Sequence, residues 1–105
     1  MPKTLIILPR AEADVDAHAL YYQTHDSPAV ASRFLDDLRH AFERVLGFPN
    51  VGKLWPTTSR ELQGLRRWPL PHFPYSIFYL PSETTIEIVR VLHNSRDLPP
   101  LLEDQ

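Results

Sequence analysis

One stretch constrains the fold more than any other part of the chain: residues 85–97, which read TIEIVRVLHNSRD. Its first part is rich in β-branched residues, which favour a strand, and its end is polar from His93 onward. Strict alternation divides the side chains between two faces, with Ile86, Ile88, Arg90 and Leu92 on one and Glu87, Val89, Val91 and His93 on the other. Both faces are mostly apolar, which is typical of an interior strand covered on both sides.

Arg90 stands out within this stretch because it shares a face with three aliphatic side chains. A guanidinium group there is unfavourable unless it is paired or reaches the rim of the sheet. Pairing with a carboxylate, for example Asp14 or Asp37, and exposure to a partner are the alternatives that the sequence leaves open.

Length and charge exclude several classes of protein. The chain has 105 residues, which predicts a single domain over residues 1–105. It has no cysteine, which excludes disulfides and thiolate chemistry and fits a reducing cytoplasm. No apolar run approaches the roughly 20 residues of a membrane helix. A net charge of −2 argues against direct, sequence-specific nucleic-acid binding by the chain alone.

The periodicity of the remaining chain predicts an α+β fold. We expect a strand over residues 4–8, a helix over residues 10–23, a second helix after Ser27, a loop over residues 49–59, strands over residues 62–68 and 75–80, and a tail over residues 98–105. The short link between the helices predicts an antiparallel hairpin. The last three strands form an antiparallel meander laid against that hairpin, and the neighbour of the N-terminal strand stays open.

The second helix carries the clearest local pattern. Ser27 suits its N-cap, Pro28 its first position, and Gly47 its end. Its apolar side is predicted to hold Ala31, Phe34, Leu35, Leu38, Ala41, Phe42 and Val45, and its polar side Arg33, Asp36, Asp37, Arg39, His40 and Glu43. Farther along, Pro69, Pro71 and Pro74 cannot donate to a sheet ladder, so their strand lies at an edge or is interrupted there.

Basic residues gather in the middle of the chain, between Lys53 and His72. Arg66, Arg67 and Trp68 combine charge with a stacking surface, as in proteins that bind single-stranded nucleic acid. The same triplet also suits an edge strand whose tryptophan packs inward and whose arginines meet a protein. The negative net charge favours the protein partner.

His93 is the strongest candidate for chemistry. With Arg90 and Arg96 it could act as a general base beside two anion stabilisers, as in metal-free RNA cleavage. Alternatively, it is a strand-end histidine bonded to backbone or carboxylate, and Arg96 pairs with Asp97. No histidine spacing predicts a metal site, and we expect His18 to be solvent-exposed beside Asp14 and Asp16. No cofactor motif is present, so no cofactor is predicted.

The ordered set of these features resembles the ParE branch of the RelE/ParE toxins of bacterial type II toxin–antitoxin systems. The resemblance covers nearly the whole chain and rests on Pro9, Ala11, Ala13 and Asp14, Tyr21 or Tyr22, Ala31, Phe34 and Leu38, Pro49 and Gly52, Leu65–Arg67, Tyr75–Tyr79, Ile88–His93, and Arg96 with Asp97. Its most specific part is the run RVLHNSRD.

The resemblance implies a toxin of the bacterial cytoplasm that a cognate ParD-like antitoxin wraps and neutralises. ParE-type members poison DNA gyrase by binding, whereas RelE-type relatives cut mRNA on the ribosome, often with a tyrosine just past the last strand. No tyrosine follows residue 79 here.

Gyrase inhibition by binding, with no catalytic residues, is therefore the first hypothesis. A ribonuclease using His93, Arg90 and Arg96, or an inactive antitoxin-bound relative, is the alternative. The residues expected to contact target or antitoxin are Arg60, Arg66, Arg67, Trp68, Arg90, His93 and Arg96.

Overall fold

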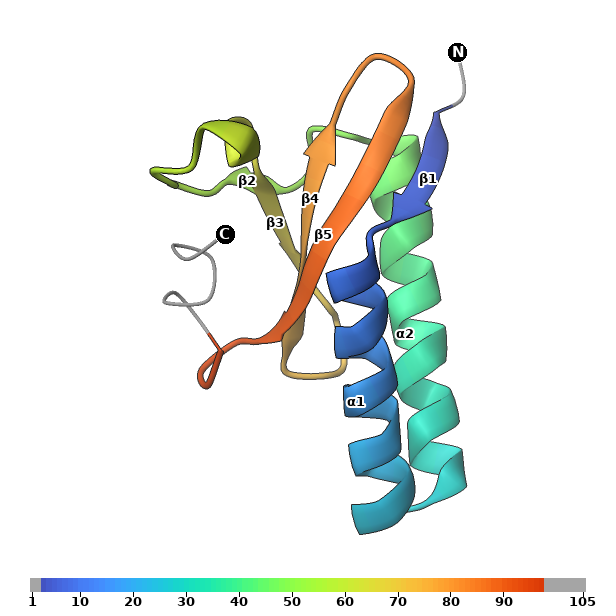
Figure 1. Ribbon diagram of the computed structural model, residues 1–105. Helices are drawn as coiled ribbons and strands as arrows, with labels where there is room; N and C mark the ends of the chain where they lie inside the picture. Colours follow the sequence, from blue (N-terminus) through green and yellow to red (C-terminus); the bar gives the residue numbers. More distant parts are fainter. Residues whose placement is uncertain (1–2, 98–105) are drawn as a thin grey trace.

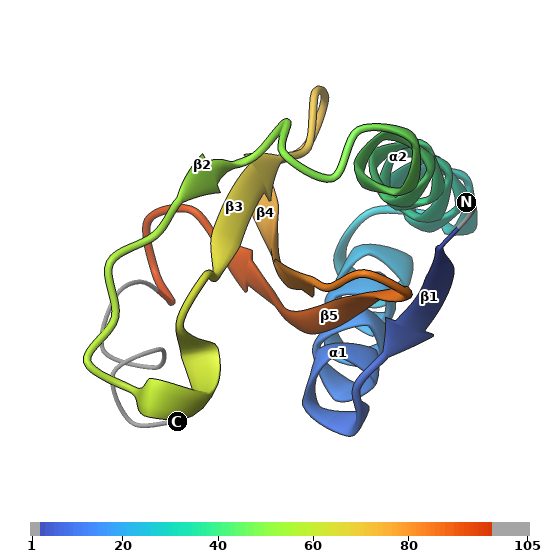
Figure 2. The ribbon, with the colours of Figure 1, turned by 90° about the horizontal axis from the view of Figure 1, so that it is seen from above.

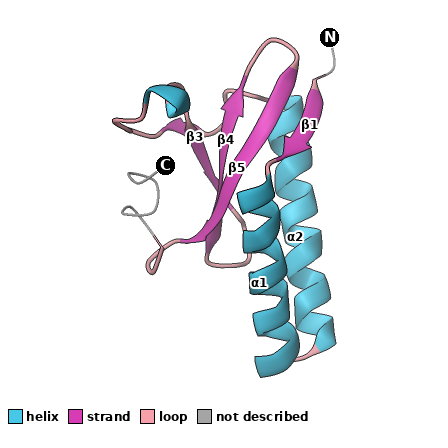
Figure 3. Cartoon of the chain, viewed as in Figure 1, coloured by secondary structure: helices cyan, strands magenta, loops and turns pink. Residues whose placement is uncertain are grey.

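A computed structural model describes residues 3–97 of the chain (Figure 1), and the predicted tail, residues 98–105, lies outside the described residues. The elements follow in the order β1 (Thr4–Ile7), α1 (Pro9–His25), α2 (Pro28–Gly47), β2 (Lys53–Leu54), the 3-10 turn η1 (Arg60–Leu62), β3 (Arg66–Pro69), β4 (Tyr75–Pro81) and β5 (Thr85–His93). Figure 3 shows the two helices side by side as a hairpin next to the strands. The predicted α+β class and helix hairpin are confirmed.

The strands form one sheet in the order β1-β5-β4-β3-β2. β1 pairs in parallel with β5, and the other pairs are antiparallel. β5 therefore lies between β1 and β4, which confirms the interior strand that its two apolar faces predicted. The parallel β1–β5 pair supplies the neighbour that the sequence left open.

Two apolar clusters cover the two faces of this sheet. The larger one joins both helices to β4 and β5 and includes Phe34, Leu38, Tyr75, Ile77 and Ile88. The smaller one includes Leu62, Leu65, Phe78, Val89 and Leu92. We call the face covered by this smaller cluster the outer face, because it lies away from the helix hairpin (Figure 2).

Local capping fixes the start of α2 as predicted. The Ser27 hydroxyl accepts a hydrogen bond from the N–H of Val30 at 3.2 Å, and Pro28 opens the helix. α2 ends at Gly47. α1 is longer than predicted, because Pro9 already occupies its first turn and the helix continues to His25.

The predicted alternation of β5 holds through Val89 and is wrong from Arg90 onward. Tyr79 pairs with Ile88 but Phe78 pairs with Arg90, so the register shifts by one residue between them. This β-bulge exchanges the faces of the residues that follow. Val91 consequently joins the helix-side cluster, and Leu92 joins the outer cluster instead of sharing a face with Ile88.

The predicted strand over residues 62–68 and the predicted loop over residues 49–59 also need correction. Leu62 lies in η1, and β3 begins only at Arg66. Two residues of the predicted loop, Lys53 and Leu54, form β2 and pair with Arg67 and Arg66. A two-residue strand is too short to show a period in the sequence.

The proline prediction is confirmed, since β3 ends at Pro69 and β2 pairs only with its first two residues. Two side chains of α2 differ from their predicted environments. Leu35 was placed on the packed side but is 44% exposed, whereas Asp37, placed on the polar side, is buried.

Candidate functional site

Arg90 lies in the protein interior and is paired with α1. Its Nε donates to Asp14 Oδ2 at 2.7 Å, and its Nη2 donates to Asp14 Oδ1 at 2.9 Å. These hydrogen bonds raise the pKa of Arg90 further above its ordinary value. Arg90 is 6% exposed, so its side chain is not offered to a partner at the surface. Of the alternatives left open by the sequence, the structure selects Asp14.

Asp14 and His18 also complete the hydrogen bonding of β5 where β1 has ended. Asp14 Oδ2 accepts the N–H of Val91 at 3.0 Å, and His18 Nε2 lies 2.8 Å from the carbonyl oxygen of Val91. One turn of helix thus takes the place of a neighbouring strand. The expectation that His18 is solvent-exposed is wrong, since it is half-buried and its ring lies 4.3 Å from that of Tyr75.

Arg66 fixes the loop before β2. Its Nη1 donates to the carbonyl oxygen of Gly52 at 2.6 Å. The buried Tyr79 hydroxyl binds the same loop, accepting from the N–H of Gly52 at 2.9 Å and donating to the carbonyl oxygen of Pro49 at 2.8 Å. Arg66 therefore serves the fold of this loop.

Arg67 belongs to a polar network that joins β3, β4 and the turn after β5 on the outer face. Its Nε donates to Ser76 Oγ at 2.9 Å, and its Nη2 donates to Asn94 Oδ1 at 3.3 Å. Ser76 Oγ donates to the same Asn94 oxygen at 2.6 Å. The guanidinium also lies 5.5 Å from the centre of the Trp55 ring. Sequence reasoning missed Trp55, Ser76 and Asn94 because no local motif links them.

Trp68 points to the other face, where it packs half-buried against the helix-side cluster. The triplet Arg66, Arg67 and Trp68 is therefore split between the two faces of β3, as alternation requires. It does not form one continuous patch.

His93 lies at the end of β5 with one ring nitrogen committed. Nδ1 accepts from the backbone N–H groups of Ser95 at 3.2 Å and Arg96 at 3.3 Å, so the neutral ring carries its proton on Nε2. Burial, then the charge of Arg96, lower the pKa of His93 below its ordinary value. Asp97 Oδ2 accepts the His93 N–H at 2.9 Å. This geometry is the strand-end histidine of the second interpretation. The predicted ion pair of Arg96 with Asp97 is absent from the described residues, because the Asp97 carboxylate binds the backbone of His93 instead.

Arg60 in η1 and Arg96 after β5 are exposed. Both segments lie on the side of the sheet away from the helix hairpin in Figures 1 and 2. The structure thus brings Arg60, Arg67 and Arg96 to one side of the sheet and keeps Arg90 inside. The His93 ring instead lies 5.2 Å from that of Tyr75, in the cluster on the helix side. In residues 3–97 no group of three or more His, Asp or Glu side chains is arranged to hold a metal ion.

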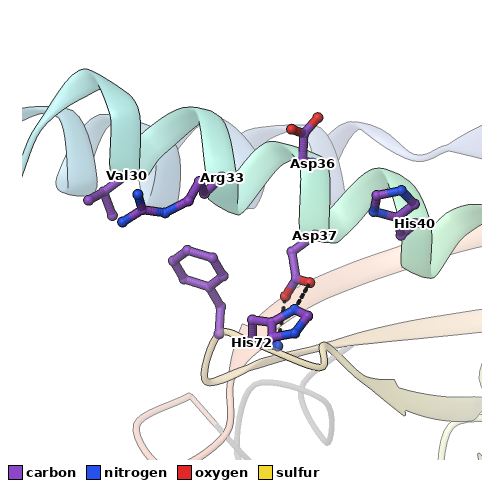
Figure 4. Close-up of a pocket in the computed structure, with 7 residues that line it drawn as sticks. Val30, Arg33, Asp36, Asp37, His40 and His72 are labelled. Atoms are coloured by element: carbon purple, nitrogen blue, oxygen red, sulfur yellow. Dashed lines mark hydrogen bonds and ion pairs between the residues drawn. The ribbon is translucent and has the colours of Figure 1, made fainter.

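A second polar feature, absent from the sequence predictions, joins α2 to the loop between β3 and β4 (Figure 4). Asp37 accepts the backbone N–H of His72 at 2.9 Å and lies 2.8 Å from His72 Nδ1. Both residues line an open hollow of about 600 Å³ with Arg33 and His40. Asp37 anchors this loop, and its 35-residue separation from His72 left no local signal.

This architecture is shared with a protein of known structure. A solved structure described as the chromosomal ParDE TA system from P. aeruginosa has the same fold, with a TM-score of 0.72 and 23% sequence identity. The similarity covers 87% of this chain and 95% of that one. The fold is therefore the ParE-like α+β fold.

The family follows from the sequence match. The sequence family model described as the ParE toxin of the type II toxin–antitoxin system parDE matches residues 5–98. The chain belongs to the ParE toxin family of type II toxin–antitoxin systems. A comparison with curated protein sequences gave no match. In the described residues, no helix has the length and apolar character needed to cross a membrane.

Proposed function

We propose that this protein is a toxin of the bacterial cytoplasm that acts by binding DNA gyrase and that a cognate ParD-like antitoxin neutralises it. The observation that carries the proposal is the ParE family match over residues 5–98, nearly the whole chain. Growth arrest on expression without the antitoxin is the cellular consequence.

The arrangement of the basic residues supports binding over catalysis. A ribonuclease using His93, Arg90 and Arg96 needs all three at a bound phosphate. Arg90 is instead buried against Asp14, and His93 Nδ1 accepts two backbone N–H groups. A free nitrogen of His93 therefore does not lie beside two accessible guanidinium groups, as a ribonuclease site would need.

The side of the sheet away from the hairpin is the surface we assign to the target. Arg60 and Arg96 are exposed there, and the half-buried Arg67 lies on the same face, paired with Phe78. Exposed guanidinium groups suit an acidic protein surface and accelerate encounter with it. Arg90 is buried, and Arg66 holds the loop before β2 from the opposite face of β3, so neither belongs to this surface.

The helix hairpin is the surface we assign to the antitoxin. Leu20, Tyr21 and Leu35 on its two helices are exposed by 60%, 45% and 44%. Exposed apolar side chains on a helix pair fit the apolar face of an amphipathic segment. An antitoxin bound there would bury them.

The test is DNA supercoiling by purified gyrase with increasing amounts of the antitoxin-free protein, scored also for linear, cleaved DNA. We expect inhibition together with accumulated DNA breaks. No effect from protein shown to be folded would reject gyrase as the target. Cleavage of ribosome-bound mRNA, lost in His93→Ala, would instead support the ribonuclease. Absence of both effects and of growth arrest would identify an inactive relative.

A further inference from the structure

A hollow of about 460 Å³ crosses the free edge of the sheet at β2. Its walls include both tryptophans of the chain, Trp55 and Trp68, together with Leu54, Lys53 and Arg67. Trp55 packs against the outer cluster and Trp68 against the helix-side cluster. The hollow therefore has contacts with both faces of the sheet and opens at its edge.

The two faces differ in chemistry at this edge. Lys53 and Arg67 are direct cross-strand partners, and like charges in that position repel each other. Arg67 hydrogen-bonds only neutral groups, and within residues 3–97 neither cation forms an ion pair. On the opposite face, Leu54 is 64% exposed beside the half-buried Trp68. The face with Lys53 and Arg67 is thus complementary to negatively charged groups, and the face with Leu54 and Trp68 is complementary to apolar side chains.

Within the described residues, no strand pairs with the edge of β2 that faces away from β3. The N–H of Trp55 bonds the carbonyl oxygen of Leu65 in the neighbouring chain segment at 2.8 Å. Because backbone groups alternate in direction along a strand, those of Leu54 point away from β3. β2 is the last strand of the sheet on this side, so a further strand can hydrogen-bond there.

We propose that the β2 edge binds an extended protein segment in which acidic and apolar residues alternate. Pairing with Leu54 places the acidic side chains over Lys53 and Arg67 and the apolar ones over Leu54 and Trp68. Nucleic acid supplies negative charge but no backbone groups for a sheet edge, so the open edge favours a peptide. This inference does not depend on gyrase being the target.

Intrinsic fluorescence gives a direct test, because the only two tryptophans line the hollow. The probe is the capped peptide Glu-Val-Glu-Leu-Glu-Val-Glu, titrated into the full chain at low salt. We expect a saturable change in tryptophan emission that weakens as salt is added. The same peptide with lysine in place of glutamate is expected to leave the emission unchanged. Equal binding of the lysine peptide, or no change with the glutamate peptide, would overturn the proposal.

Matched variants separate this site from other exposed apolar positions. Leu54→Asp and Lys53→Glu should each weaken peptide binding about tenfold through charge repulsion at the edge. Phe48 is 59% exposed and does not line the hollow, so Phe48→Asp is the control and should bind as the unmodified protein does. Thermal unfolding checks that all three variants are folded. Equal weakening by Phe48→Asp would contradict a site at β2.

Other occupants give distinct results. A single-stranded oligonucleotide that changes the emission and displaces the glutamate peptide would identify a nucleic-acid site. Association of the protein with itself, lost in Leu54→Asp, would identify a second copy as the occupant. An emission change in the peptide-free double variant Glu103→Lys, Asp104→Lys would identify the chain's own C-terminal residues. Each of these results would replace the proposed partner segment.

Discussion

At the scale of single residues, the buried pair of Arg90 and Asp14 holds α1 on the sheet. Asp14 accepts three hydrogen bonds, two from Arg90 and one from the N–H of Val91. The sequence indicated that Arg90 needed a partner, because a guanidinium among aliphatic side chains is unfavourable. Asp14 lies 76 positions away, so only packing could choose it over Asp37.

Removing the Asp14 carboxylate should therefore destabilise the fold strongly. Asp14→Ala leaves a buried, unpaired guanidinium, and the free energy of unfolding should fall by about 3 kcal/mol or more. Urea unfolding measures this change. Asp16→Ala, at an exposed position on the same helix, is the control and should have little effect. A loss below about 1 kcal/mol in Asp14→Ala would show that the pair does not hold the helix in place.

His93 should make stability depend on pH. Its pKa in the folded protein is lowered below the ordinary value of 6.5, so the folded state holds fewer protons than the unfolded state. The stabilisation is complete above that value and is lost as the pH falls through the lower pKa of the folded protein. Urea unfolding at about pH 7.5 and about pH 5 should show a smaller loss for His93→Gln than for the unmodified protein. His40→Gln, at an exposed position on α2, should lose as much stability between these two pH values as the unmodified protein does.

At the scale of elements, the loop before β2 depends on one close approach. A Cβ atom on Gly52 would lie 2.7 Å from the carbonyl oxygen of Arg67 and 2.8 Å from the Tyr79 hydroxyl. Both contacts are shorter than side-chain atoms normally make, and neither neighbour can move without losing hydrogen bonds. The loop can therefore lie this close to β3 and β4 only because Gly52 has no side chain.

Gly52→Ala is accordingly expected to lower the free energy of unfolding by about 2 kcal/mol, as overpacking does. Gly47→Ala is the matched control, because a Cβ there would meet nothing within 4 Å. That control should be neutral or stabilising by up to about 1 kcal/mol, since alanine favours a helix more than glycine does. Thermal or urea unfolding of the two variants measures both effects. Equal stabilities would contradict the close approach at Gly52.

At the scale of the whole molecule, the proposed target surface and the helix hairpin lie on opposite sides of the sheet. The pair Arg60→Glu, Arg96→Glu reverses two exposed charges on the proposed target surface. We expect about tenfold more protein to be needed for gyrase inhibition, because like charges now face the target. The control pair Arg33→Glu, Arg39→Glu, exposed on α2, should inhibit at the original concentration. Unchanged inhibition by the first pair would remove this surface from the proposal.

The sequence by itself determined the elements whose information is local. The helical period and the Ser27–Pro28 cap specify α2, and the two apolar faces of residues 85–93 specify an interior strand. The prolines after Arg67 correctly indicated an interrupted strand. Such features depend on residues within one or two turns of each other, so they can be read without knowing the fold.

Tertiary structure alone decided how distant residues meet. It set the bulge that exchanged the faces of Val91 and Leu92, paired Asp37 with His72, and divided Arg66 and Arg67 between two networks. Each outcome depends on contacts between elements that lie tens of positions apart. Before the helices and strands pack together, pairing with several alternative partners has a comparable free energy. Close packing then leaves room for only one arrangement.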